Sequence, residues 1–256
     1  MLKGKTVVIT GASSGIGAAC AEVCARARAN IVLIARREDK LRAVVESLPP
    51  NVQSRILMCD VRNYGEVETA LATLDGEWAA PEILINNAGL SRGLAPLQTG
   101  LLSDWEEMID TNVKGLLYVT KEVLPGMIAR GTGTIVNIAS IAGRQTYPNG
   151  NVYCATKAAV RALSESLQYD TLGTGVRVTN IDPGMVETEF SEVRFHGDTE
   201  RAKKVYDGMT PLTARDVAET VLYCITRPPH ISIQDILLMP SAQASVHAVH
   251  RQPTSA

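Results

Sequence analysis

A tyrosine and a lysine stand four residues apart at Tyr153 and Lys157, in the stretch YCATK. Residues four apart lie on the same face of a helix, so the phenol and the ammonium would be neighbours. A free tyrosine, with a pKa of about 10, is a poor base at neutral pH. A nearby positive charge favours the phenolate and lowers that pKa, so the pair could pass a proton to or from a carbinol oxygen. The same spacing is also common on helix surfaces, and the pair alone does not decide between the two interpretations.

A serine hydroxyl is the second candidate for chemistry. Ser140 ends a predicted strand and precedes Tyr153 by thirteen residues. The short intervening loop can fold back and place the hydroxyl beside the phenol. There it would hydrogen-bond a substrate oxygen and stabilise the charge that develops on it. A serine at this position also suits a simple cap.

A glycine-rich turn joins the first predicted strand to the first predicted helix in VVITGASSGIG. Glycines at this point let the backbone approach a pyrophosphate, which the free N–H groups at the helix start then bind. A plain structural turn is the alternative, but the strand before it and the helix after it favour nucleotide binding. The residues assigned to this site are Gly11, Ser13, Ser14, Gly15, Ile16 and Gly17.

Two arginines, Arg36 and Arg37, follow the second predicted strand, where an adenine ribose would lie. Guanidinium groups suit a 2′-phosphate because they form forked, charge-assisted hydrogen bonds to it. This pattern favours NADP(H) over NAD(H), and a solvated basic pair is the alternative. Asp60 and Val61 close the third strand and would contact the adenine, although Asp60 also suits a helix N-cap.

Composition limits the class of protein. The chain has 256 residues, of which 45% are apolar and 20% are charged, with a formal net charge of −2. The balance of charge argues against a nucleic-acid partner, and no apolar run is long enough to span a membrane. The five cysteines form no CxxC pair and suit a reducing cytoplasm. The histidines lack a metal-ligand spacing, so no metal is assigned.

Strand-like and helix-like segments alternate along the chain. Strands rich in valine, isoleucine and leucine, without polar alternation, are covered on both faces. The pattern predicts an α/β fold: one Rossmann domain over residues 1–256, with a doubly wound, parallel, seven-stranded sheet and helices on both faces. The expected strands are 5–10, 30–35, 53–60, 82–89, 133–140, 176–184 and 234–240. The expected helices are 14–28, 37–48, 63–74, 103–128, 151–172 and 213–226.

The ordered set of motifs TGASSGIG, NNAG, Asn112, Ser140 and YCATK resembles the short-chain dehydrogenase/reductase family over essentially the whole chain. The resemblance implies reversible hydride transfer at a nicotinamide, with Tyr153 as acid and base. It implies that Lys157 also binds the nicotinamide ribose and that Asn112 holds a water linking Lys157 to solvent. Further residues that it assigns to the NADP site are Asn86, Asn87, Ala88, Gly89, Pro183, Gly184, Val186 and Thr188.

The stretches IAGRQTYPNGNVY and VRFHGDTERAKKVYDG are similar to a subgroup, the bacterial NADP-dependent 3-hydroxy acid dehydrogenases, which oxidise L-serine and L-allo-threonine. A carboxylate substrate needs a cation, and Arg144 and Arg194 are the candidates, with Tyr147 as a pocket wall. Either arginine also suits a surface ion pair. The charged segment 191–208 is expected to be a helical insertion that closes over the substrate as a lid.

Other functions remain open at this stage. The substrate could instead be a neutral ketone or aldehyde, reduced by a broad NADPH-dependent carbonyl reductase. A non-catalytic NADPH-binding protein could use the same fold. Family resemblance also implies a homotetramer, built by the helices expected at 103–128 and 151–172.

Overall fold

Seven parallel strands form the centre of the molecule. The structure, a computed structural model, describes residues 2–252. The strand order is β3-β2-β1-β4-β5-β6-β9, and every pairing between neighbours is parallel. The prediction of a doubly wound sheet is therefore confirmed, and each strand overlaps an expected one. Their bounds are β1 Thr6–Thr10, β2 Asn30–Ala35, β3 Ser54–Met58, β4 Ile83–Asn86, β5 Gly133–Ile138, β6 Val176–Pro183 and β9 Asp235–Leu238.

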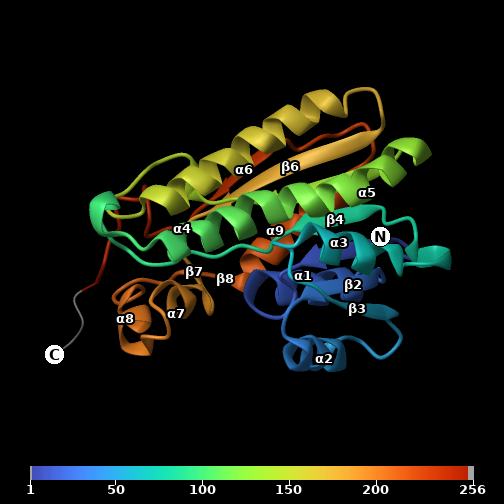
Figure 1. Ribbon diagram of the computed structural model, residues 1–256. Coiled ribbons are helices and arrows are strands. Elements are labelled where there is room, and N and C mark those ends of the chain that lie inside the picture. Colours follow the sequence, from blue (N-terminus) through green and yellow to red (C-terminus); the bar gives the residue numbers. More distant parts are fainter. Residues whose placement is uncertain (1, 253–256) are drawn as a thin grey trace.

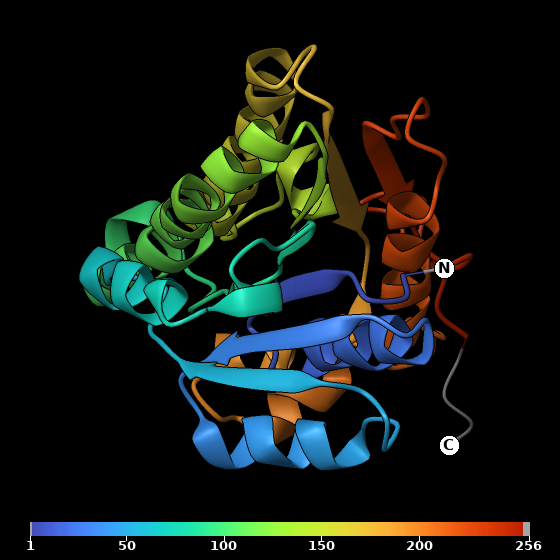
Figure 2. The ribbon, with the colours of Figure 1, turned by 90° about the vertical axis from the view of Figure 1, so that its right-hand side faces the viewer.

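Helices cover both faces of this sheet, as Figure 2 shows. One face packs against α1 (Gly15–Arg26), α2 (Glu38–Ser47) and α9 (Ala214–Ile225). The other packs against α3 (Tyr64–Ala72), α5 (Leu116–Arg130) and α6 (Asn151–Asp170), with α4 (Leu102–Ile109) beside α6. Successive strand residues enter opposite layers, so in β1 Val7 and Ile9 join the first core and Val8 the second. Both layers are apolar, which explains why the strand sequences show no polar alternation.

The helix expected over 103–128 is interrupted. A π-helical turn at Asp110–Gly115 separates α4 from α5. Gly115 faces Val61, and an added Cβ there would lie 2.7 Å from a Val61 methyl group. The turn lets the chain pass close to the end of β3, and it carries Asn112. Single π-turns occur often at functional sites, and the hydrophobic period alone does not reveal them.

Segment 191–208, which was expected to be a helical insertion, is largely helical and adds no strand to the seven-stranded sheet. Figure 1 shows its two short helices, α7 (Phe190–Arg194) and α8 (Thr199–Lys204), below α4. A two-stranded parallel pair, β7 (Val186–Glu187) and β8 (Leu212–Thr213), closes the segment at its base. Across residues 2–252, no helix is long and apolar enough to cross a membrane. The five cysteines are buried and unbridged.

Candidate active site

A cleft of about 320 Å³ opens at the carboxyl ends of the strands. It lies where the strand order reverses beside β1, the place at which open α/β sheets bind ligands. Its walls come from the turns after six strands of the sheet, β1 to β6, from α6 and from α7. The cleft collects most residues assigned to the cofactor: Gly11, Ser13, Ser14, Gly15, Ile16, Arg36, Arg37, Asp60, Val61, Asn87, Ala88, Gly89, Pro183, Gly184, Val186 and Thr188.

The glycine turn has the shape that close backbone approach requires. Gly11 has a φ of 65°, and a Cβ on it would lie 2.8 Å from the Ala88 Cα. Gly17 sits behind the cleft, where a Cβ would lie only 2.4 Å from the Gly11 carbonyl oxygen. Ser14, the N-cap of α1, makes no side-chain cap, so its hydroxyl leaves the N–H groups of the first turn available to an anion. These features fit a dinucleotide pyrophosphate.

Thr10, at the end of β1, links the glycine turn to the loop that follows β4. The hydroxyl of Thr10 accepts hydrogen bonds from the backbone N–H groups of Asn87, at 3.0 Å, and Ala88, at 2.9 Å. The Asn87 amide in turn donates to the Thr10 carbonyl. Asn86 behaves differently from its prediction, because its amide donates to Thr120 and Asn137 inside the core. Its side chain is therefore part of a buried polar chain and does not line the cofactor site.

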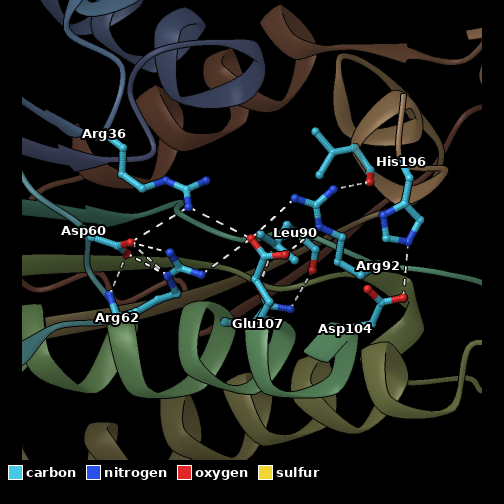
Figure 3. Close-up of polar contacts among 10 residues, drawn as sticks. Arg36, Asp60, Arg62, Leu90, Arg92, Asp104, Glu107 and His196 are labelled. Atoms are coloured by element: carbon cyan, nitrogen blue, oxygen red, sulfur yellow. Dashed lines mark hydrogen bonds and ion pairs between the residues drawn. The ribbon is translucent and has the colours of Figure 1, made fainter. Parts of the chain in front are cut away.

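Both arginines at the end of β2 line the cleft, and each meets carboxylates. Arg36 lies 3.9 Å from an Asp60 oxygen and 4.0 Å from a Glu107 oxygen (Figure 3). Asp60 also accepts hydrogen bonds from the Arg62 guanidinium. Burial raises the pKa of Asp60, but the hydrogen bonds and charge of Arg62 outweigh it and hold the pKa below the usual range. Asp60 is not the N-cap of α3, because Asn63 accepts those backbone hydrogen bonds. The cap interpretation of Asp60 was wrong.

Tyr153 lies in the cleft wall, and only 7% of the residue is exposed. Burial raises the pKa of its phenol above the ordinary value, while the charge of Arg194 and a hydrogen bond with Ser140 lower it. The balance differs from the expectation that Lys157 would lower this pKa, because Lys157 Nζ stands 6.0 Å from the ring centroid. Ser140 accepts a hydrogen bond from the Ala142 N–H, so it caps a short turn as well as meeting the phenol.

Lys157 is buried and points at the backbone. Its Nζ donates to the Ile138 carbonyl at 2.9 Å. Burial lowers the pKa of Lys157 to about 8. Asn112 lies nearby, since both side chains would lie 3.2 Å from a Cβ placed on Gly89. The Asn112 amide exchanges hydrogen bonds with both backbone groups of Leu90 and donates to Thr156, so the π-helical turn ties the end of β4 to α6.

Arg194, the last residue of α7, is not itself among the residues that line the cleft, but it packs against two aromatic rings of the cleft wall. Its guanidinium carbon lies 5.2 Å from the Tyr153 ring centroid and 5.0 Å from the Phe190 ring centroid. One terminal nitrogen donates to the Tyr147 hydroxyl at 2.9 Å. Within the described part of the chain, its buried Nε has no hydrogen-bond partner. Of the two arginines considered for a carboxylate, this one is at the phenol.

Arg144 is not in the cleft, which corrects the other candidate. Its Nε donates to Asp182 at 2.6 Å, and its terminal nitrogen contacts Asp235. Asp182 is fully buried and accepts the Ser140 backbone N–H at 3.1 Å. Arg144 therefore neutralises the carboxylate that holds the backbone of Ser140. Its charge is paired within the protein and is not available to a substrate carboxylate.

Sequence reasoning missed several residues around the cleft. Arg92, Glu107 and Glu189 form ion pairs there, and Asp182 anchors Ser140. These contacts join residues far apart in the chain, and no local pattern marks them. Among residues 2–252, no cluster of histidine, cysteine or acidic groups could hold a metal. His196 instead pairs with Asp104 at 3.3 Å (Figure 3).

The comparisons with known proteins agree with this geometry. The sequence pattern of the short chain dehydrogenase family matches residues 5–198. An NADP-dependent 3-hydroxy acid dehydrogenase of Salmonella typhi is 45% identical over 247 residues, which is 96% of this chain and 99% of that protein. One of Schizosaccharomyces pombe is 40% identical over 254 residues, 98% of each chain. This chain belongs to the short-chain dehydrogenase family.

Solved structures give the same result. The closed form of a serine dehydrogenase complexed with NADP⁺ is 44% identical, with a TM-score of 0.91, over 96% of this chain and 100% of that one. A serine dehydrogenase from Escherichia coli is 40% identical, with a TM-score of 0.81, over 93% of this chain and 99% of that one. These TM-scores show that the chain shares its overall fold with the two serine dehydrogenases.

Replacing Arg144 with methionine should destabilise the fold in a pH-dependent way. Burial raises the pKa of Asp182 in the folded chain, so stability is lost as pH rises through that folded pKa. Arg144 lowers the same pKa, so without Arg144 the folded-state pKa of Asp182 rises further. The pH range over which stability is lost then extends closer to neutral pH. We expect a loss of about 3 kcal/mol at neutral pH, as for a broken buried pair, and a smaller loss in mildly acidic buffer.

Urea unfolding at the two pH values measures this difference. Arg215→Met, which breaks an exposed pair with Glu219, is the control and should cost under about 1 kcal/mol at either pH. An Arg144→Met loss that is as small as the control, or that grows as the pH falls, would contradict the account of Asp182.

Proposed function

We propose that this chain is an NADP-dependent oxidoreductase that moves hydride reversibly between the nicotinamide and the hydroxyl-bearing carbon of a small 3-hydroxy acid, such as L-serine or L-allo-threonine. The observation that carries the proposal is the burial of the Tyr153 phenol beside Ser140 and Arg194, in a cleft whose glycine turn fits a pyrophosphate. The names of the similar bacterial and yeast proteins support the same activity.

NADP(H), when bound, supplies or accepts the hydride. The glycine turn would hold its pyrophosphate, and Arg36 and Arg37 would hold its 2′-phosphate. Asp60 and Val61 would border the adenine. The loop at 87–89 and the turn at 183–188 would border the nicotinamide half, with Lys157 on the ribose. The backbone N–H groups in the first turn of α1 and the guanidiniums of Arg36 and Arg37 give this cleft the positive potential that a phosphorylated dinucleotide needs.

Tyr153 would act as the acid and base. In alcohol oxidation the phenolate form of Tyr153 would take the proton of the substrate hydroxyl and become the neutral phenol, and in carbonyl reduction the phenol would return that proton. Ser140 would hydrogen-bond the same substrate oxygen and hold it in place. Asn112, whose side chain lies close to Gly89 as Lys157 does, would hold a water that links Lys157 to solvent. Asp182 would keep Ser140 in position through its backbone N–H.

Arg194 would bind the substrate carboxylate. It lies over the Tyr153 ring, is oriented by the Tyr147 hydroxyl and has an unpaired buried Nε within the described chain. Because Arg194 belongs to segment 191–208, the segment would act as a lid: closing it would bring the cation to the substrate and exclude water. The paired strands β7 and β8 at its base would serve as the hinge.

Replacing Tyr153 with phenylalanine should abolish turnover and spare cofactor binding. The change removes only the hydroxyl, and a positioned proton donor contributes at least about 100-fold to the rate. We expect kcat for L-serine oxidation to fall by at least this factor, while the Kd for NADPH, measured by fluorescence titration, stays within about twofold of wild type. Tyr223→Phe, on the exposed face of α9, is the control. A variant that keeps wild-type kcat would exclude Tyr153 as the acid and base, and no turnover by the wild type on any substrate would favour a binding protein.

Replacing Arg194 with methionine should impair carboxylate substrates selectively. A hydrogen-bonded charge is worth about 1.5–3 kcal/mol, so kcat/KM for L-serine and L-allo-threonine should fall about 10- to 100-fold. Neutral alcohols should be affected less, because they lose only the effect of the Arg194 charge on the Tyr153 phenol. Arg201→Met, in the same segment and stacked on Phe195, is the control. If kcat/KM falls equally for the 3-hydroxy acids and for neutral alcohols, Arg194 does not bind the substrate carboxylate. If the wild type reduces neutral ketones much faster than it forms any 3-oxo acid, the carbonyl reductase alternative replaces this proposal.

A homotetramer in a cytoplasmic location completes the proposal. Leu102, Ile109 and Leu117, on α4 and α5, are each more than 40% exposed, and apolar side chains grouped in this way suit a subunit interface. Four copies of the 27.5 kDa chain would sediment at about 110 kDa. A species at the mass of a single chain, at every concentration tested, would exclude the tetramer.

A further inference from the structure

Glu189 already pairs with cations at the proposed 2′-phosphate position. It is the last residue before α7. One of its carboxylate oxygens accepts from both terminal nitrogens of Arg37 at 3.1 Å, and the other contacts Lys40. Arg37 also donates to the hydroxyls of Ser13 and Ser14 in the glycine turn. The guanidinium thus lies between the pyrophosphate turn and the start of segment 191–208.

These ion pairs are suited to exchange with another anion. The side chains of Arg37, Lys40 and Glu189 are each more than a third exposed, and exposed ion pairs contribute little to stability. A phosphate carries more charge than a carboxylate and offers three acceptor oxygens to a guanidinium. Hydrogen bonds from Lys40 and Arg37 keep the pKa of Glu189 below its usual range, so the carboxylate is ionised at neutral pH and repels a second anion.

We propose that Glu189 determines cofactor preference by competing with the 2′-phosphate for Arg37 and Lys40. The proposal rests on the NADP binding proposed above and does not depend on turnover. Because the 2′-phosphate would need Arg37 and Lys40 directly, the carboxylate opposes NADP(H) more than NAD(H) and reduces the advantage of NADP(H). The wild-type preference is then a balance between two cations that attract the phosphate and one anion that resists it.

The far end of α7 is held independently of Glu189. The Val193 carbonyl accepts from Arg92, whose guanidinium is paired with Glu107, as Figure 3 shows for the labelled arginine and carboxylate. The Gly93 N–H donates to the Arg194 carbonyl at 2.9 Å. Loss of the Glu189 charge therefore leaves α7 attached at its other end. A variant at this position should fold and present the same cleft.

The test is isothermal calorimetry on the full chain with 2′,5′-ADP and with 5′-AMP, which lacks the 2′-phosphate. Glu189→Gln keeps the shape of the side chain and removes its charge. We expect it to bind 2′,5′-ADP about fivefold more tightly than wild type, a gain that shrinks at high salt, and to show a clearly smaller gain for 5′-AMP. Glu192→Gln is the control, since this exposed carboxylate lies in the same helix and forms no ion pair among the described residues.

Three results would overturn the inference. They are an unchanged or weaker affinity of Glu189→Gln for 2′,5′-ADP, an equal gain for 5′-AMP, and an equal gain in Glu192→Gln. Circular dichroism and thermal melting of each variant verify that it is folded. Failure of the proposed NADP binding looks different, because wild type would then bind 2′,5′-ADP no more tightly than 5′-AMP.

Discussion

The proposed active site depends on a phenol that is buried beside a positive charge. Burial alone makes Tyr153 a weaker acid, because a phenolate loses its hydration there. The charge of Arg194 and the hydroxyl of Ser140 act in the opposite direction and come from separate elements. The cation nearest the ring is supplied by α7, and not by the lysine one helical turn away. Proton affinity at the phenol therefore depends on its burial first, and then on how the segment after β6 places Arg194 beside the ring.

The sheet makes this packing possible, because parallel strands bring their carboxyl ends to one edge. β1 supplies the glycine turn, β4 the floor and β5 the serine. β6 supplies Asp182, which fixes the Ser140 backbone from beneath and is neutralised by Arg144. The charged groups thus fall into two sets. The ion pair of Arg144 with the buried Asp182 holds the backbone near Ser140, and the partly exposed Arg36 and Arg37 line the cleft.

Much of this arrangement is readable from the sequence, since apolar runs and glycine turns act locally. The seven strands, the nucleotide turn and the Ser140–Tyr153 contact belong to this class. The role of Arg144 does not, because its partners Asp182 and Asp235 are distant in the chain and only folding reveals them. The π-helical turn that carries Asn112 was not predicted, because the sequence analysis expected one unbroken helix over 103–128. Glu189 carries no local signal, and its ion pair with Arg37 joins the turn after β2 to the start of α7, more than 150 residues later in the chain.

The most direct test of the central claim is a spectroscopic titration of Tyr153, taken as the phenolate absorbance of wild type minus that of Tyr153→Phe. The account predicts that this phenol ionises above the ordinary tyrosine pKa of about 10 in the protein alone, and at a still higher pH once Arg194 is replaced by methionine. A phenol that ionises at the ordinary value and does not respond to Arg194 would contradict the account, since it would be neither buried nor governed by that cation.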